Sequence, residues 1–491
     1  MTGEPASFRP KPRLPRGFED RLPAQLALET HIVAKATATY HTWGFEPLET
    51  PAFEYADTLG KFLPDQDRPN EGVFALQDDD GQWMSLRYDL TAPLARFVAE
   101  HRQSLPRPYR RYAAGPVWRN EKPGPGRFRQ FWQCDADSVG APGPAADAEV
   151  IAMMAEALEA IGLAPGDYVI KLSDRRLLDG LLDTLGLAHD EAGRRARIAV
   201  LRSIDKIDRL GADGVRLLLT TGRKDDSGDF TPGACLEPAM ADRVLAFVAG
   251  GAGIDDLERL AAGSAAGTAG ASSLRQIAEI LARLGLDASS WRLDTSVVRG
   301  LEYYTGPVFE AETVLNDVQG RRISFGSVAS GGRYDGLVAR FGGEAAPATG
   351  CSIGVSRLAA VLQAAGRAPG ADAGPVVVLA LQGEHMPDYF AMAQSLRGAG
   401  FRAEVYVGGA GMKAQMKYAD KRGAAVAVIV GEDERAKGVV TVKNLRLGQY
   451  YAALAGDARD AWKNVQGLIQ VEAPRDALVE TVKAAMSARA P

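Results

Sequence analysis

The chain has 491 residues, of which 46% are hydrophobic and 24% charged, so it can form two or three domains with cores of ordinary size. Its formal net charge of −5 excludes a globally basic nucleic-acid binder, and a polyanionic partner must be met by local basic patches. No stretch reaches the roughly 20 uninterrupted apolar residues that a membrane-spanning helix requires.

The N-terminal segment indicates the cellular compartment, and the cysteines bear on disulfide bonds and metal sites. Residues 1–15 are polar and rich in proline, without the apolar core of a secretory signal, so a cytoplasmic location is expected. Cys134, Cys235 and Cys351 are too scattered for a disulfide framework or a thiolate zinc site, and the five histidines lack metal-ligand spacing. We expect no protein-bound transition metal, which leaves magnesium carried by a nucleotide.

The first predicted elements are a helix over 24–43 and an extended segment at 47–51. Apolar residues at helical spacing indicate the helix, and two prolines end it. A second helix is expected after Asp89, whose short carboxylate can cap free N–H groups at a helix start. A third helix is expected over 144–161, and the alternation over 167–172 predicts a strand.

The segment between residues 105 and 133 is dense in arginine. This composition suits a phosphorylated ligand, because a guanidinium fork can pair with two phosphate oxygens. The basic residues are Arg107, Arg110, Arg111, Arg119, Lys122, Arg127 and Arg129, against the single acid Glu121. The chain holds no G-x-x-x-x-G-K-[ST] segment, so a bound ATP must be held by arginines rather than by a P-loop. A solvated face with surface ion pairs is the structural alternative.

Residues 174–290 have helical periodicity, and they predict a helical insertion with a flexible loop in the Ala/Gly/Ser-rich stretch 260–273. The elements expected next are strands at 292–314 and 322–329, a glycine-rich turn at 330–336 and a helix at 352–364. Antiparallel strands interrupted by helices indicate an α+β domain.

Residues 364–375 have the composition of a linker, and a domain boundary is expected there. After it, apolar strands alternate with helices, which implies a separate α/β domain with a largely parallel sheet. The expected elements are strands at 376–381, 402–407 and 424–430, and helices at 387–399 and 411–422.

Five segments together resemble the signature motifs of one enzyme family. They are Leu86 to Pro93, Trp118 to Gln133, Asp294 to Gly306, Ser330 to Leu337 and Gly350 to Leu358. They are similar to the motifs of histidyl-tRNA synthetases, which are class II aminoacyl-tRNA synthetases. The resemblance implies an α+β class II catalytic domain, with an antiparallel sheet and helices, over 1–173 and 291–365. It also implies the helical insertion at 174–290, a linker at 366–374 and an α/β anticodon-binding domain over 375–491.

The resemblance assigns the groups that bind and activate ATP. Arg119 is expected at the α-phosphate and Arg357 at the far end of a bent ATP, with Glu121 and Phe131 at the adenine. Arg299 resembles the family's catalytic arginine, which stabilises the charge that develops on the α-phosphate as the carboxylate of histidine attacks. A surface ion pair explains any one of these arginines, but not several in matching order. Ser356 departs from the pattern, because the family commonly has a glutamate before the arginine of its third motif.

A site that selects histidine must satisfy both ring nitrogens and the α-amino group, because unpaired buried polar atoms are costly. The resemblance assigns Asp89 and Gln133 to the amino and carboxylate side, and Asp137 and Tyr304 to the imidazole. The structural alternatives are a helix cap for Asp89 and positions on the sheet surface for Gln133 and Asp137. The full histidine-binding set that the resemblance implies is Asp89, Leu90, Thr91, Arg119, Gln133, Asp137, Arg299, Tyr303 and Tyr304.

The resemblance also implies a tRNA partner and a homodimer. A predicted helix presents Lys413, Lys417 and Lys421 along one side at spacings of four residues, and Arg127 is a further expected tRNA contact. The loop 122–126 has few polar side chains for reading an acceptor stem, and the need for an extra 5′ guanosine on the tRNA stays open. The segment Thr50-Pro51 resembles the end of the motif at the family's dimer interface.

The function that the resemblance implies is that of a histidine–tRNA ligase. Such an enzyme uses ATP, with magnesium, to convert histidine to histidyl-adenylate and pyrophosphate, and then transfers histidine to the 3′-terminal adenosine of its tRNA. One alternative is a synthetase-like, histidine-sensing regulatory subunit of ATP phosphoribosyltransferase, and another is a non-catalytic tRNA-binding or signalling module. Regulatory paralogues generally lack the C-terminal domain and often the catalytic arginine, both of which this sequence contains.

Overall fold

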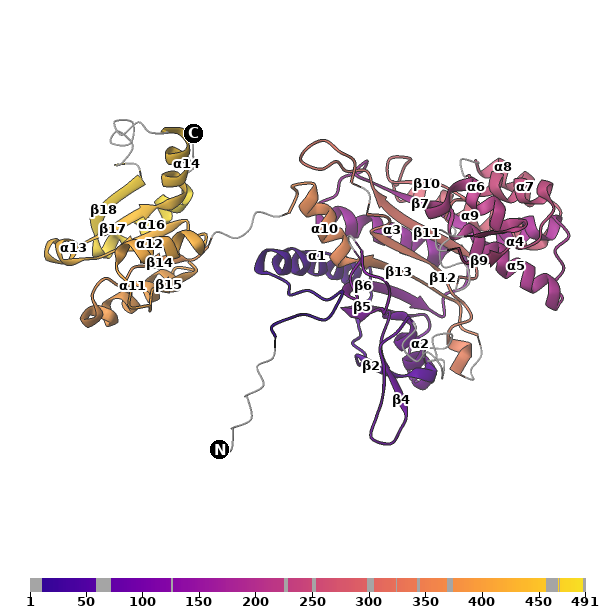
Figure 1. Ribbon diagram of the computed structural model, residues 1–491, viewed down its shortest axis with the longest axis horizontal. Coiled ribbons are helices and arrows are strands. Elements are labelled where there is room, and N and C mark those ends of the chain that lie inside the picture. Colours follow the sequence, from indigo (N-terminus) through magenta and orange to yellow (C-terminus); the bar gives the residue numbers. More distant parts are fainter. Residues whose placement is uncertain are drawn as a thin grey trace, which may run out of the picture. The chain divides into compact units, whose positions relative to one another are not determined.

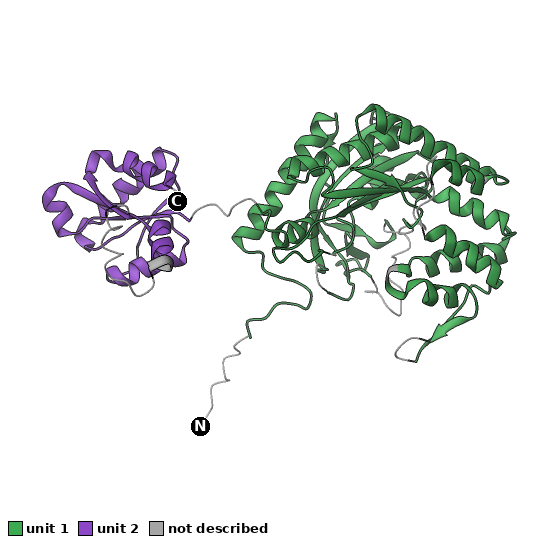
Figure 2. Cartoon of the chain, turned by 90° about the horizontal axis from the view of Figure 1, so that it is seen from above, with its two compact units in different colours: residues 1–369 green, residues 370–491 purple. Residues whose placement is uncertain are grey.

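The computed structural model describes residues 11–58, 72–124, 127–224, 228–249, 253–297, 304–323, 325–341, 345–368, 374–455, 467 and 469–488. The chain divides into two compact units, Met1–Pro369 and Gly370–Pro491 (Figure 2). None of the helices in these ranges combines the length and the hydropathy needed to cross a membrane.

The first unit is built on an eight-stranded sheet with the order β1-β5-β6-β13-β12-β11-β7-β10. Only the outer strands β1 and β10 run parallel to their neighbours, and the other pairs are antiparallel. The strands are β1 (Glu46–Pro47), β5 (Tyr109–Trp118), β6 (Gln130–Val139), β7 (Tyr168–Asp174), β10 (Trp291–Leu293), β11 (Pro307–Thr313), β12 (Ala329–Arg333) and β13 (Ala348–Gly354). This sheet confirms the predicted α+β class.

Three helices cover one face of this sheet (Figure 1). They are α1 (Pro23–Thr42), α3 (Pro144–Ile161) and α10 (Val355–Ala364). Helix α3 has the predicted bounds, because Pro144 suits a first turn and Gly162 ends the helix with a φ of 122°. The buried ion pair between Arg333 and Asp147 joins the end of β12 to the start of α3. This face carries the main core.

The opposite face carries smaller elements near β5 and β6. Helix α2 (Thr91–Glu100) packs beside a short helical turn, η2 (Val338–Phe341). A three-stranded antiparallel sheet has the order β2-β4-β3 and comprises β2 (Phe53–Tyr55), β4 (Trp83–Leu86) and β3 (Ala75–Gln77). Among the described residues, these elements cover the part of this face formed by β5 and β6.

The helical insertion contains six helices and a hairpin among its described residues (Figure 1). They are α4 (Arg175–Thr184), α5 (Glu191–Ile204), α6 (Ile207–Leu219), β8 (Gly222–Lys224), β9 (Phe230–Pro232), α7 (Pro238–Val248), α8 (Ile254–Ala261) and α9 (Ala265–Arg283).

The flexible loop predicted at 260–273 is wrong, because α9 starts at Ala265. Ser264 caps this helix by accepting a hydrogen bond from the N–H of Gly267. A Cβ atom on Gly180 of α4 would lie 2.6 Å from the Cα of Gly267. The small residues of this stretch therefore serve the close packing of two helices, not chain flexibility.

Four further predictions in the first unit need correction. The strand expected at 322–329 begins only at Ala329, and the glycine-rich turn expected at 330–336 lies partly in β12. The long strand at 292–314 is two strands, β10 and β11, and its middle lies outside the described residues. The helix expected from 352 begins at Val355, because the preceding residues belong to β13.

Glycines in β12 allow aromatic rings to lie directly on the strand. A Cβ atom on Gly332 would lie 2.8 Å from the Tyr304 ring, and one on Gly331 would lie 2.5 Å from the Phe309 ring. Glycine is used here for close approach rather than for a turn.

The second unit is a five-stranded sheet with helices on both faces. Its strands are β14 (Val376–Val378), β15 (Ala403–Val405), β16 (Val426–Ile429), β17 (Val439–Asn444) and β18 (Gln470–Pro474). Its helices are α11 (Met386–Gly398), α12 (Met412–Lys421), α13 (Glu432–Lys437), α14 (Leu445–Ala455) and α16 (Leu478–Ser487). The sheet is mixed rather than largely parallel, because β17 and β18 pair antiparallel.

Candidate active site

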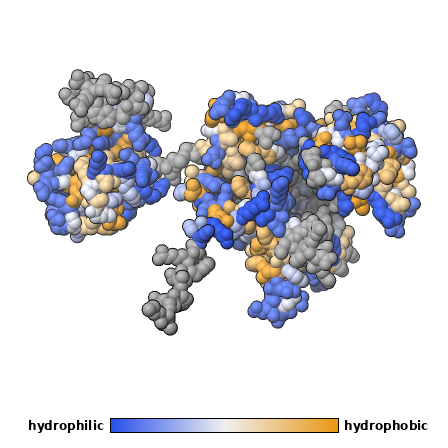
Figure 3. All heavy atoms as spheres, in the orientation of Figure 1, coloured by the Kyte–Doolittle hydropathy of each residue, from blue (hydrophilic) through white to orange (hydrophobic). Residues whose placement is uncertain are grey.

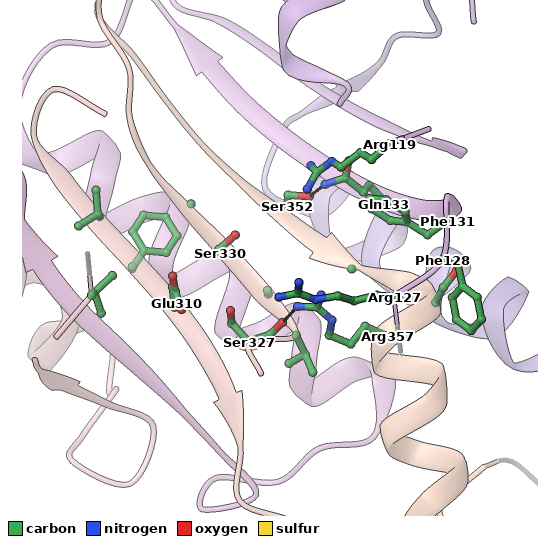
Figure 4. A pocket seen from close by; sticks show the side chains of 18 of the residues that line it. Arg119, Arg127, Phe128, Phe131, Gln133, Glu310, Ser327, Ser330, Ser352 and Arg357 are labelled. Atoms are coloured by element: carbon green, nitrogen blue, oxygen red, sulfur yellow. Dashed lines mark hydrogen bonds between the residues drawn. The ribbon is translucent and has the colours of Figure 1, made fainter. Parts of the chain in front are cut away.

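A pocket of about 320 Å³ lies on the accessible face of the large sheet (Figure 4). Strands β6, β11, β12 and β13, the start of α10 and the segment that joins β5 to β6 contribute to its wall. Its polar lining consists of Arg119, Glu121, Arg127, Gln133, Tyr304, Glu310, Ser327, Ser330, Ser352, Ser356 and Arg357. Among the predicted residues, Arg119, Glu121, Phe131, Gln133, Tyr304 and Arg357 are thereby brought together with Arg127.

Arg119 follows directly after β5 and is held from two sides. Its Nε donates a hydrogen bond of 3.1 Å to the carbonyl oxygen of Tyr88. Its guanidinium carbon lies 5.1 Å from the centroid of the Phe131 ring, a cation–π distance. The remaining guanidinium nitrogens keep a positive charge at the pocket beside an aromatic surface, as a nucleotide requires.

Arg357 reaches the same pocket from the first turn of α10. Its Nη1 donates a hydrogen bond of 2.8 Å to the carbonyl oxygen of Ser327, which precedes β12. The neighbouring Ser356 accepts a hydrogen bond of 3.1 Å from the backbone N–H of Trp132. The serine at the position of the expected glutamate thus ties α10 to β6, one residue beyond Phe131.

Gln133 lies in β6 and points its amide into the pocket (Figure 4). Its Nε2 donates a hydrogen bond of 2.7 Å to Ser352 Oγ, on the neighbouring strand β13. Its Oε1 is buried and has no hydrogen-bond partner among the described residues. An orphaned buried acceptor is costly, so it marks the place where a ligand's N–H group fits.

Asp137, four residues further along β6, already contacts other side chains of the protein. Its Oδ2 lies 2.9 Å from Arg111 Nη2, and its Oδ1 accepts a hydrogen bond from the hydroxyl of Tyr334. Burial raises the pKa of Asp137, while the charge of Arg111 and the Tyr334 hydrogen bond lower it. Gly350 lies opposite and leaves no room for a side chain, because a Cβ atom there would overlap Oδ1 of Asp137. Asp137 is not among the residues that line the pocket.

Asp89 caps α2, as its structural alternative stated. Its Oδ1 accepts hydrogen bonds of 3.2 and 2.9 Å from the backbone N–H groups of Thr91 and Ala92. Burial raises the pKa of Asp89, while these hydrogen bonds and the charge of Arg119 lower it. The carbonyl oxygen of Leu90 accepts a hydrogen bond of 2.8 Å from Arg111 Nη2. The segment 89–91 is thus hydrogen-bonded to Arg111 through the Leu90 carbonyl, and Arg111 is in turn paired with Asp137.

Of the three remaining predicted histidine contacts, the structure describes only Tyr304. Tyr304 lines the pocket and lies against Gly332, and burial raises the pKa of its hydroxyl. Arg299 and Tyr303 lie outside the described residues. Their assignment therefore stays a prediction.

Asp135 was missed in the sequence, although it lies between Gln133 and Asp137 on the same face of β6. It is 2% exposed, and burial raises the pKa of its carboxyl group to about 7. Glu310, Ser327 and Ser330 of the pocket wall were also missed. The alternation of polar side chains at 133, 135 and 137 was the available signal, since residues two apart share a face of a strand.

The lysines predicted to contact tRNA lie in the second unit. Lys413, Lys417 and Lys421 are exposed on α12, while Gln415 and Ala419 of the same helix are buried. Among the residues that the structure describes, no group of three or more His, Cys, Asp or Glu side chains is arranged to hold a metal ion.

Comparisons with protein families match nearly the whole chain. The model of the family described as "Histidyl-tRNA synthetase" matches residues 17–358. A model described as "Anticodon binding domain" matches residues 375–457.

Curated proteins and solved structures with similar chains carry related names. A "Histidine--tRNA ligase" of Caulobacter vibrioides is 57% identical over 485 residues, which cover 97% of each chain. One of Jannaschia sp. is 54% identical and covers 93% of this chain and 94% of its own. The crystal structure of histidyl-tRNA synthetase from Nostoc sp. PCC 7120 has 28% identity and a TM-score of 0.71, covering 97% of this chain and 100% of that one.

A structure titled as an ATP phosphoribosyltransferase regulatory subunit/histidyl-tRNA synthetase from Bacillus halodurans is similar in fold. It has a TM-score of 0.64 at 23% identity, covering 85% of this chain and 97% of its own.

Proposed function

The chain belongs to the histidyl-tRNA synthetase family, and we propose that it catalyses both half-reactions of an ATP-dependent histidine–tRNA ligase. One observation carries the assignment of the site. Arg357 is far from Arg119 and Gln133 in the sequence, but all three line one pocket on the large sheet. The two guanidinium groups, each held by a hydrogen bond, suit a nucleoside triphosphate, and the buried Gln133 Oε1 without a partner suits an N–H group of an amino acid.

In the first half-reaction, a carboxylate oxygen of histidine attacks the α-phosphorus of ATP, and the bond to pyrophosphate breaks. Arg119, with Arg299, stabilises the charge on the α-phosphate, and Arg357 holds the far phosphates. Phe131 and Glu121 contact the adenine, and Gln133 and Tyr304 hold histidine from the pocket wall. Asp89, Thr91 and Asp137 would complete this set from beside the pocket, where Asp137 Oδ2 has no hydrogen-bond partner among the described residues. In the second half-reaction, a hydroxyl of the terminal adenosine of tRNA attacks the carbonyl carbon, and AMP leaves.

Magnesium fits the pocket as an ion that arrives with ATP. It usually keeps several waters and binds through one or two carboxylates together with substrate phosphates. Glu310 of β11 and the hydroxyl of Ser327 supply hard oxygen ligands on the wall that Arg357 also forms. Magnesium bound there would neutralise charge on the phosphates.

A homodimer is the assembly that the surface of the first unit supports. Phe53, Tyr55 and Leu76 are 44%, 54% and 43% exposed. The register of the small sheet places them on one face, because Tyr55 and Leu76 both lie opposite Met84. Figure 3 shows hydrophobic side chains at the surface in this region, above the hydrophilic hairpin tip. A second copy of the chain would cover this apolar face.

The alternative of a histidine-sensing regulatory subunit has weaker support. The similar proteins of high identity are named as ligases, and the second unit matches an anticodon-binding model. The likeness to the regulatory-subunit structure, at 23% identity, extends to the fold alone.

Substitution of the two arginines tests the proposed catalysis. We expect Arg119→Ala and Arg299→Ala each to lower the rate of adenylate formation by about a hundredfold or more, because each removes a cation from the transition state. Arg321→Ala is the matched control, since that side chain is 74% exposed and lies outside the pocket. Near-normal histidine activation by either site variant would refute the role assigned to it.

A further inference from the structure

Three polar side chains on neighbouring strands form a chain of hydrogen bonds beneath the pocket. Gln133 Nε2 donates to Ser352 Oγ at 2.7 Å, and Ser352 lies directly opposite Asp135 in the register of β6 and β13. A hydrogen bond from the Ser352 hydroxyl to the Asp135 carboxylate contributes to lowering the pKa of that carboxyl group. The chain therefore runs from the pocket wall to a buried acid.

The direction of these hydrogen bonds is determined by the Asp135 carboxylate. A carboxylate only accepts hydrogen bonds, and a serine hydroxyl has a single proton to donate. When Ser352 donates that proton to Asp135, its oxygen can only accept from Gln133. The amide of Gln133 must then turn its NH₂ group toward Ser352 and leave Oε1 as the buried acceptor without a partner.

Asp135 also has an acceptor without a partner, and other titratable groups lie around it. Its Oδ1 is buried and has no partner among the described residues. The charged and titratable groups around it on this face are Arg111, Arg87, Asp137, Asp89 and Tyr304. From the core side Tyr40 and Cys351 approach it, and burial raises the pKa of both groups, which keeps them neutral. Two buried carboxyl groups, those of Asp135 and Asp137, thus lie beside the guanidinium group of Arg111.

We propose that Ser352 and Asp135 are positioning residues, which hold the Gln133 amide so that its oxygen accepts a hydrogen bond from the α-ammonium group of histidine. This inference rests on the proposed function, because it assigns to Gln133 the amino side of the substrate. It adds two residues that the histidine-binding set implied by the resemblance does not include. Neither residue needs to touch histidine, since both act through the orientation of one amide.

Two analogues of histidine separate the contribution of the ammonium group from that of the carboxylate. Histidinol keeps the ammonium group but lacks the carboxylate, whereas 3-(imidazol-4-yl)propionate keeps the carboxylate but lacks the ammonium group. A change that frees the Gln133 amide should weaken histidine and histidinol together. It should leave the propionate nearly unchanged, because that ligand makes no use of the oriented oxygen.

The test is competitive inhibition of histidine-dependent ATP–pyrophosphate exchange in the full-length protein. For Ser352→Ala we expect the KM for histidine and the Ki for histidinol to rise about tenfold to hundredfold, the cost of a charge-assisted hydrogen bond. The Ki for the propionate and the KM for ATP should stay within about twofold of wild type. Ser352→Thr, which keeps the hydroxyl, should restore most of the preference for the ammonium ligands.

A pH profile separates this role from a merely structural one. The ring pKa of each inhibitor is measured separately, because the ammonium group lowers it in histidinol and the carboxylate raises it in the propionate. Each Ki is then corrected to the neutral ring before the ratio is taken. The ratio should favour histidinol above about pH 7, where Asp135 is ionised, and the preference should decline as the carboxyl group takes up a proton. In Asp135→Asn the ratio should lose this pH dependence.

The possible outcomes separate the inference from the proposed function. A wild-type protein without histidine-dependent exchange would overturn the proposed function and this inference with it. Normal wild-type exchange with Ser352→Ala raising both Ki values equally, or neither, would overturn the inference alone. Ser173→Ala is the matched control for a buried serine of the same sheet, since Ser173 is 4% exposed and lies outside the pocket.

Discussion

The carboxyl group of Asp135 makes the stability of the folded state depend on pH. Its pKa is raised to about 7 in the folded protein, chiefly by burial, from an ordinary value of 3.8. Between about pH 4 and pH 7 the folded state therefore holds a proton that the unfolded chain has released, and each rise in pH across this window destabilises the fold.

Asp135→Asn should remove this dependence, because an amide does not titrate. We expect the variant's thermal unfolding midpoint to exceed that of wild type by more at pH 8 than at pH 5. Calorimetric scans at the two pH values would measure this. A difference between variant and wild type that is equal at both would contradict the raised pKa. A gain in stability joined to weaker histidine binding would show that the carboxylate serves function at the expense of stability.

Gly332 should not tolerate a side chain. A methyl group there would lie 2.8 Å from the ring of Tyr304 and 2.7 Å from the carbonyl oxygen of Pro307. We expect Gly332→Ala to lose about 1–3 kcal/mol of stability through overpacking and to raise the KM for histidine more than that for ATP. Gly336→Ala is the control, because no atom lies within 4 Å of its added Cβ. Equal behaviour of the two variants in denaturation and kinetics would refute the packing argument.

At the level of single residues, the sequence predicts which residues belong to the site better than it predicts their hydrogen bonding and burial. The arginines of the pocket follow from motif order, because a phosphate site needs guanidinium groups whatever the local packing. The sequence allows two interpretations of Asp89, and only the structure shows that its Oδ1 accepts hydrogen bonds from the backbone N–H groups of α2. The alternation at 133, 135 and 137 places Asp135 on the same face as its neighbours, but no local pattern shows that its carboxyl group is buried away from water.

Among the secondary structure elements, boundaries were predictable where local chemistry sets them. Helix α3 has the predicted bounds because proline and glycine mark its ends. The prediction failed at α9, where small residues were interpreted as a flexible loop, and at β12, where glycines were interpreted as a turn. In both places the small residues allow close packing, against Gly180 in the first case and against Tyr304 and Phe309 in the second. Such contacts join residues far apart in the sequence, so composition alone cannot distinguish them from a loop.

The exposed lysines of α12 give a prediction at the level of one element. Replacing Lys413, Lys417 and Lys421 together with glutamine should weaken tRNA binding. It should also reduce the slope of log K against log salt concentration by about two to three, because each lost phosphate contact removes about 0.7 to 0.9. Binding titrations at several salt concentrations would measure the slope.

A control for this triple variant exists on another helix of the same unit. Lys483 is an exposed lysine of α16, and Lys483→Gln should leave both affinity and slope unchanged. Histidine-dependent pyrophosphate exchange should be unaffected in either variant. An unchanged salt slope in the triple variant would remove α12 from the proposed tRNA surface.

The division of the whole molecule into two units predicts separable activities. The core clusters of the second unit consist of residues from 376 onward, and no residue of the first unit belongs to them. A chain ended after Pro369 should therefore fold and keep histidine-dependent pyrophosphate exchange. It should lose most aminoacylation of tRNA at low tRNA concentration, and a truncated chain with full aminoacylation would contradict the proposed role of the second unit.

The central claim is that this pocket activates histidine with ATP. The most direct measurement is ATP–pyrophosphate exchange with magnesium, tested with each of the twenty amino acids and without tRNA. The account predicts exchange with histidine alone, at a rate that Arg119→Ala reduces about a hundredfold or more. Measurable histidine binding without exchange for any amino acid would contradict the claim and would support a histidine-sensing protein instead.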